Sequence, residues 1–246
     1  MKDIVELTGT IEEITRTIFA DRRPGRTLDV ATGRGGMINL MRGSFSERDF
    51  IHAIDADFGV LQVTQSEMDK EITSLAQMDA VQMGFRSACF ELVSIGFSLH
   101  HLEDIDSTLR EIWRVTSTGG VCLVSEMYCD GLTRAQLSET NLHHFVADID
   151  QALGKSHNHT LSRNQILDHL TRISWVDISV YSHSPTMGVD AQTAFERVDN
   201  QLTEHLNRAK GHKRYHEFNQ QAETIRDWVR KWGVERAPVL LVLCRK

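Results

Sequence analysis

The sequence predicts an α/β protein, a doubly wound and mostly parallel sheet of seven strands with helices on both faces and helical insertions. Two observations predict this fold class. Short apolar runs alternate with segments of helical periodicity between residues 27 and 127, which is typical of strand–helix–strand units. A glycine-rich turn, "ATGRGG", also follows the first strand of this series, "TLDVA", and precedes a helix.

The first half of the chain supplies five of the strands. Apolar residues recur at three- and four-residue steps from Ile4 to Ile18, which predicts one amphipathic helix before the sheet begins. The segment "DIDSTLREIWRVTSTGG" is predicted to be a helix that ends with a glycine cap at Gly119 and Gly120. The five expected strands are "TLDVA", "FIHAID", "SLAQMDA", "FELVSIGFSL" and "VCLVSEM".

The pattern changes after residue 130. Residues 130–172 are predicted to be mainly helical with a polar break at "GKSHNHTLS", after which Ser162 and Gln165 resemble a capping box. Residues 190–232 are again predicted to be helical. The segments "VDISVYSH" and "APVLLVLCRK" complete the seven strands. Because no linker or repeat stands out, one domain with helical insertions is expected.

Composition and charge argue against several classes of function. The formal charge of −7 argues against a general nucleic-acid binder, and no apolar run approaches the length of a membrane span. The four cysteines show no paired metal-binding spacing, so a reducing, cytoplasmic location is expected. The basic and aromatic stretch 212–232 could suggest RNA binding, but a solvated amphipathic helix is the favoured interpretation.

The glycine turn and two aspartates indicate a nucleoside ligand. Gly33, Gly35 and Gly36 would let a ligand approach the backbone without clashing with a Cβ atom. Asp55, twenty residues past Gly35, ends the second strand, where a carboxylate can accept hydrogen bonds from both ribose hydroxyls. Asp55 could also serve as the N-cap of the next helix.

The same residues favour S-adenosylmethionine over a nicotinamide dinucleotide. A dinucleotide fingerprint would place glycine or alanine where this chain has Ile38. Asp29, at the end of the first strand, suits a cationic ammonium group and is poorly placed for a diphosphate. An NAD-linked oxidoreductase and a non-catalytic protein that binds S-adenosylmethionine remain the alternatives.

Four ordered segments carry a family resemblance: "LDVATGRGG", "IHAIDAD", "MDAVQMGFRSACFELV" and "SIGFSLHHLED". Together they resemble class I S-adenosylmethionine-dependent methyltransferases, in particular the small-molecule branch that includes the ubiquinone and menaquinone biosynthesis enzymes. The resemblance covers roughly residues 25–125 and the final strand. The chain departs from the family pattern at Ala31, Gly84, Glu91 and Gly96.

The resemblance implies a Rossmann-like methyltransferase fold whose last strand is antiparallel. Residues 1–246 would form a single methyltransferase domain, with a cofactor-binding core at about 25–128. The insertions at about 130–172 and 185–235 would cap the carboxyl end of the sheet and enclose a small acceptor. The acceptor, the atom that is methylated and the oligomeric state, including a homodimer, are left open.

The resemblance also assigns roles to residues. Asp29 would lie near the amino-acid end of the cofactor, Asp55 would bind the ribose, Asp79 and Ala80 would bind the adenine, and Gly96 would line the methyl-donor channel. The expected cofactor-binding residues are Asp29, Ala31, Gly33, Gly35, Asp55, Ala56, Asp79, Ala80 and Gly96.

Histidines supply the candidates for the acceptor side. The pair His100 and His101 is interpreted as structural or pocket-lining, because the family shows this pair without a shared chemistry. The candidate residues near the acceptor are His100, His143, His144 and His157. Their spacing matches no tight zinc signature, so no metal is expected. No catalytic residue is assigned, since the sulfonium of the cofactor already supplies a leaving group.

Overall fold

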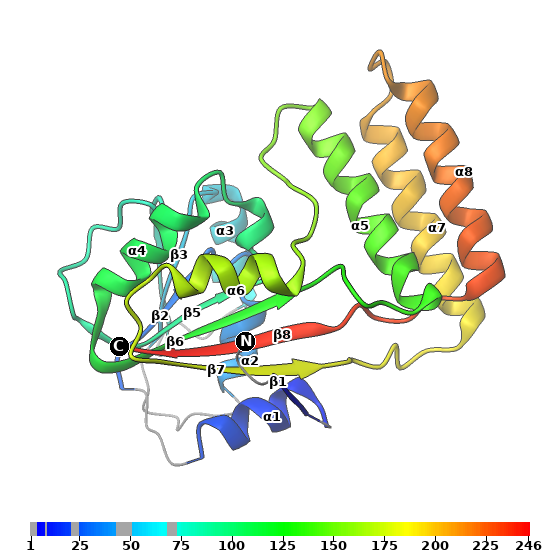
Figure 1. Cartoon of the computed structure of the whole chain (residues 1–246). Helices are drawn as coiled ribbons and strands as arrows, with labels where there is room; N and C mark the ends of the chain where they lie inside the picture. Colours follow the sequence, from blue (N-terminus) through cyan, green and yellow to red (C-terminus); the bar gives the residue numbers. More distant parts are fainter. Residues whose placement is uncertain (1–3, 8, 21–24, 43–50, 68–72) are drawn as a thin grey trace.

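The computed structural model describes residues 4–7, 9–20, 25–42, 51–67 and 73–246. They form one eight-stranded sheet in the order β1-β7-β8-β6-β5-β2-β3-β4, with helices against the sheet and a helical bundle beyond one end (Figure 1). Every neighbouring pair of strands is parallel except β8 with β6 and with β7. The predicted α/β class and the antiparallel last strand are confirmed.

The strands are β1 (Ile4–Glu6), β2 (Thr27–Val30), β3 (Ile51–Asp55), β4 (Thr73–Gln77), β5 (Phe90–Gly96), β6 (Thr116–Met127), β7 (Asp177–His183) and β8 (Val239–Arg245). The helices are α1 (Ile11–Ile18), α2 (Gly36–Arg42), α3 (Phe58–Glu67), the short 3₁₀ helix η1 (Leu99–His101), α4 (Ile105–Val115), α5 (Arg134–Ala152), α6 (Arg163–Thr171), α7 (Ala191–Arg208) and α8 (Tyr215–Trp232).

The predicted helix over residues 4–18 is wrong in its first part, and this adds the eighth strand. A capping box starts α1 at Thr10, where the backbone N–H of Glu13 donates to the Thr10 hydroxyl and the Glu13 carboxylate accepts from the Thr10 N–H. Gly9, at φ 119°, turns the chain just before it. Ile4 instead pairs with Val180 of β7, so β1 extends the sheet at its edge.

The predicted glycine cap of α4 is also wrong. The helix ends at Val115, and Thr116 is already extended and pairs with Phe90 of β5. The Thr116 hydroxyl donates to the Ile112 carbonyl at 2.7 Å, which satisfies one of the free carbonyl groups of the last helical turn. Gly119 and Gly120 therefore lie inside β6 and do not end the helix.

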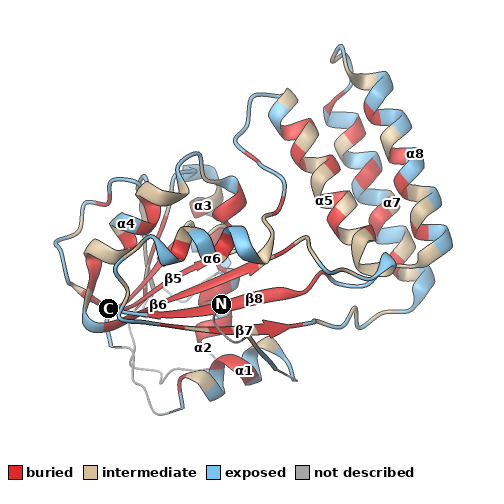
Figure 2. Cartoon of the chain, in the orientation of Figure 1, coloured by how far each residue is buried: buried red, intermediate tan, exposed pale blue. Residues whose placement is uncertain are grey.

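The sheet is packed on both faces, as the buried strands in Figure 2 show. One face packs against a cluster that includes Leu109 and Ile112 of α4 and Ile166 and Leu170 of α6. The other face packs against a cluster that includes Ile14 of α1 and residues of α2. Hence part of the predicted 130–172 insertion, helix α6, covers a sheet face. Ser162 and Gln165 form the predicted capping box at its start.

Helices α5, α7 and α8 form a three-helix bundle at the carboxyl ends of β6 and β7 (Figure 1). The bundle has its own apolar core, which includes Phe145, Leu202 and Phe218. Because the apolar face of α8 is buried in this core, the basic and aromatic stretch 212–232 is accounted for by an amphipathic helix. Among the described residues, no helix has both the length and the apolar character that a membrane crossing requires.

Candidate functional site

The glycine-rich turn joins β2 to α2 through an unusual backbone. Gly33 and Gly35 have φ angles of 53° and 79°, in the left-handed region that favours glycine. A Cβ added at Gly33 would meet no atom within 4 Å, so the space above the turn is open. Ala31 also lies in this region, at φ 52°, where many proteins of the resembled family carry glycine. The turn therefore keeps a strained backbone beside an open space.

Asp55 ties this turn to the end of β3. Its Oδ2 accepts a hydrogen bond from the backbone N–H of Gly33 at 2.9 Å, and its Oδ1 accepts from the N–H of Asp57 at 2.9 Å. The helix N-cap that Asp55 could have formed is made by Asp57, whose carboxylate accepts from the N–H of Gly59 at 2.8 Å. Asp55 is thus free of the capping role and faces the open space above the turn.

Asp29 is fully buried at the end of β2. Its two carboxylate oxygens accept hydrogen bonds from the hydroxyls of Ser94 at 2.6 Å and Thr32 at 2.7 Å. Burial raises the pKa of Asp29, the two hydroxyls offset part of that rise, and the charge of Asp55 adds to it, so that the pKa is about 6. A cationic ligand group next to Asp29 would favour its ionised form.

These elements surround a cavity of about 730 Å³, here called the donor cavity. It is lined by eight of the nine residues predicted to bind the cofactor: Asp29, Ala31, Gly33, Asp55, Ala56, Asp79, Ala80 and Gly96. Gly35, the ninth, lies in the turn but does not line the cavity. The acidic lining residues Asp29, Asp55, Asp57, Asp79 and Asp150 outnumber the basic ones, Arg34 and Lys155, so the cavity favours a cationic ligand.

Gly96 ends β5 and leaves room for the side chain of Met37. A Cβ at position 96 would lie 2.3 Å from the Met37 Cγ and 2.7 Å from its Sδ. Met37 would then have to move, and both residues line the donor cavity.

We expect Gly96→Ala to lower the free energy of unfolding by about 1–3 kcal/mol, the usual cost of overpacking, as measured by urea denaturation. In a Met37→Ala background, the same Gly96→Ala substitution should cost less than it does in wild type, because the side chain that the new Cβ would meet is gone. Gly36→Ala is the matched control, because a Cβ there meets no atom within 4 Å. Equal stability of Gly96→Ala and wild type would contradict this account of the glycine.

A second cavity of about 490 Å³, here called the acceptor cavity, lies between the sheet and the bundle. Its lining includes Met127 at the end of β6, Val239 of β8 and Leu142 of α5. Phe97 and His101 line both cavities, so the two spaces adjoin there. Phe97 has φ 52° and remains 43% exposed. Such backbone strain is concentrated at functional sites.

The predicted acceptor-side histidines separate into two groups. His100 and His143 line the acceptor cavity, and His157 contacts His143 with 3.2 Å between their Nε2 atoms. His144 lines neither cavity; it bonds the Thr160 hydroxyl at 2.8 Å and stacks on His159.

The structure adds two buried carboxylates that the sequence analysis did not single out. Glu126 of β6 lies 3.0 Å from His100 Nδ1 and accepts from the backbone N–H of Leu99 at 2.8 Å. Asp150 of α5 lies 2.8 Å from His157 Nδ1 and is also paired with Arg208. The sequence could have pointed to Glu126, because an acidic residue within an apolar strand is costly to bury without a partner. Asp150 pairs with His157 only seven residues away, but its second partner, Arg208, comes from α7.

Comparisons with known proteins agree with this geometry. A family model described as a methyltransferase domain matches residues 28–124. The demethylmenaquinone methyltransferase of Bacteroides fragilis is 29% identical over 109 residues, which cover 43% of this chain and 44% of that protein. The match thus spans less than half the length of this curated relative.

Solved structures share the fold at low sequence identity. The YcgJ protein of Bacillus subtilis is 17% identical with a TM-score of 0.60, covering 96% of this chain and 98% of that one. Phosphoethanolamine N-methyltransferase 2 of Haemonchus contortus, solved with phosphomonomethylethanolamine and S-adenosylhomocysteine, is 17% identical with a TM-score of 0.56, covering 96% and 52%. Residues 28–124 of this chain are therefore similar in sequence to a methyltransferase domain, and the chain as a whole shares the fold of these solved structures.

Proposed function

We propose that this protein transfers the methyl group of S-adenosylmethionine to a small-molecule acceptor. The observation that carries the proposal is the pair of adjoining cavities. One is acidic with a glycine turn in its wall, and the other lies beneath a helical bundle. They share Phe97 and His101, so a donor in the first and an acceptor in the second would meet at these residues.

The residues of the donor cavity fit the cofactor. Asp29 suits its ammonium group, Asp55 its ribose hydroxyls, and Asp79 with Ala80 its adenine. The bound cofactor supplies a methyl group on a positively charged sulfur, which is already a good leaving group. A diphosphate, in contrast, would face several carboxylates in this cavity, which argues against a dinucleotide.

The protein's own contribution is positioning and exclusion of water. The bundle and the carboxyl edge of the sheet line the acceptor cavity, and its volume of about 490 Å³ favours a small acceptor. Burial lowers the pKa of His143 to about 2 and that of His101 to about 4, with further lowering from neighbouring histidines. Both imidazoles are therefore neutral at pH 7, and the His101 ring can accept a hydrogen bond from a hydroxyl or amine of the acceptor.

Isothermal titration with S-adenosylmethionine, S-adenosylhomocysteine and NAD⁺ tests the donor side. We expect the first two to bind and NAD⁺ not to bind. Binding of NAD⁺ without S-adenosylmethionine would overturn the proposal in favour of an oxidoreductase. For turnover, we expect S-adenosylhomocysteine to form when a panel of phenols, quinols and amines is offered. Binding without turnover across the panel would instead favour a non-catalytic binding protein.

A further inference from the structure

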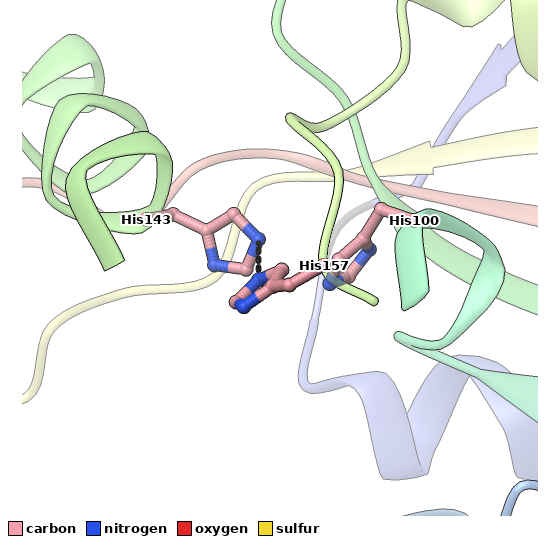
Figure 3. A group of neighbouring side chains, drawn as sticks. All are labelled: His100, His143 and His157. Atoms are coloured by element: carbon pink, nitrogen blue, oxygen red, sulfur yellow. Dashed lines mark hydrogen bonds between the residues drawn. The ribbon is translucent and has the colours of Figure 1, made fainter. Parts of the chain in front are cut away.

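Three histidines from three different elements converge beside the acceptor cavity (Figure 3). His100 comes from η1, His143 from α5, and His157 from the segment between α5 and α6. One ring nitrogen of each lies within 4.8 Å of the other two. Because the three residues are far apart in the chain, their spacing carries no metal signature. The fold nevertheless assembles a set of three imidazoles.

The spacing of these nitrogens is close to what one metal ion requires. Two imidazole nitrogens on a tetrahedral zinc ion, each about 2.0–2.1 Å from it, lie roughly 3.3 Å apart. The Nε2 atoms of His143 and His157 are 3.2 Å apart in a hydrogen bond, so an ion would take the place of that bond and the His143 proton would move to Nδ1. The longest separation within the set has to shorten by at most roughly 1.5 Å. His143, the least buried of the three, is the side chain best able to adjust.

Two buried carboxylates hold the rings in a tautomer suited to a metal. The Nδ1–H of His100 donates to Glu126, and the Nδ1–H of His157 donates to Asp150. In a neutral imidazole each Nε2 then carries a lone pair. A carboxylate that accepts from the far nitrogen of a histidine is the usual outer partner of a metal-binding histidine. Here two of the three rings have such a partner.

The groups around the cluster also favour a cation. Glu126 lies 3.0 Å from His100, and Asp150 lies 2.8 Å from His157. The side chains of both carboxylates are largely buried, at 1% and 12% exposure. Asp150 is also paired with Arg208. Two buried carboxylates therefore lie directly behind the rings that would hold the ion.

We propose that His100, His143 and His157 bind one divalent transition-metal ion, with zinc as the best fit, and that its remaining coordination position opens into the acceptor cavity. Three protein ligands with one open position is the usual arrangement of a reactive zinc site. Only the role of that open position rests on the proposed function: an oxygen, nitrogen or sulfur atom of the acceptor could fill it. The ion would also link α5 of the bundle to the sheet.

Titration of tag-free, chelator-treated protein with Co²⁺ tests the site directly. We expect about one equivalent of Co²⁺ to give visible d–d absorption, Zn²⁺ to displace it, and either ion to raise the melting temperature. His143→Ala and His157→Ala should each weaken Co²⁺ binding at least tenfold. Asp150→Asn should weaken it by about tenfold through loss of the outer carboxylate.

His216→Ala is the matched control, because His216 is an exposed histidine on α8 away from this cluster. Circular dichroism establishes that each variant is folded, and His143→Ala is the decisive one because His143 is the least buried ligand. Absence of Co²⁺ absorption in wild type, or unchanged binding in folded His143→Ala, would overturn the metal site. Titration with S-adenosylmethionine in parallel tests the donor cavity separately, since His143 does not line it.

Discussion

Replacing Asp55 by alanine is expected to raise the Kd for S-adenosylmethionine by roughly 10- to 150-fold, as measured by isothermal titration calorimetry. Without the Asp55 carboxylate, the ribose hydroxyls of the cofactor would lose a charged hydrogen-bond partner. A hydrogen bond to a charged group contributes about 1.5–3 kcal/mol. The same carboxylate accepts the N–H of Gly33 at 2.9 Å, so its loss also loosens the glycine turn. Both effects lower the affinity for the cofactor.

Asp57→Ala separates cofactor binding from local structure. Asp57 also lines the donor cavity, but its carboxylate caps α3 through Gly59. We expect this variant to lose about 1 kcal/mol of stability and to retain most of its cofactor affinity. If Asp55→Ala and Asp57→Ala weakened binding equally, the effect would come from the acidity of the wall and not from a specific ribose contact. Affinity that stays unchanged in Asp55→Ala would contradict the assignment of Asp55.

The grouping of these residues around one cavity could be predicted from the sequence because its parts are local. Asp29 and Asp55 each lie at the carboxyl end of a parallel strand, and such ends meet at one edge of the sheet. The glycine turn follows directly from the first of these strands. Eight of nine predicted residues therefore line one cavity. No tertiary information beyond the order of strands and helices is needed to bring them together.

The rest depends on contacts between distant segments. The edge strand β1 has only three residues, and it pairs with β7 far along the chain. Its apolar residues continue the helical period of α1, so the local pattern predicts a helix. The histidine cluster likewise needs the bundle to be placed against the sheet before His143 can approach His100. The spacing of the histidines along the chain therefore does not predict that they come together.

Asp29→Asn is expected to make the ligand-free protein more stable above pH 6 and to weaken its binding of S-adenosylmethionine. Because the pKa of Asp29 is raised from 3.8 unfolded to about 6 folded, the folded state binds its proton more tightly. The contribution of Asp29 to the free energy of unfolding is therefore at its maximum below pH 3.8, and it is lost as the pH rises through about 6. A shift of about two units corresponds to at most about 3 kcal/mol.

Urea unfolding of both proteins between pH 5 and pH 8 measures this difference, and subtracting one curve from the other removes the contributions of all other groups. The stability gained by Asp29→Asn should grow up to about pH 6 and then level off, since the amide that replaces the carboxylate carries no charge and can still bond the hydroxyls of Ser94 and Thr32.

Cofactor affinity should move the opposite way. Wild type should bind S-adenosylmethionine more tightly as Asp29 ionises. The variant should lose that pH dependence, because it lacks the anionic partner of the ammonium group. A variant less stable than wild type at pH 8 would mean that the ionised carboxylate is better solvated in the folded protein than its burial implies. Equal affinity in both proteins at pH 8 would remove Asp29 from the cofactor site while leaving Asp55 in it.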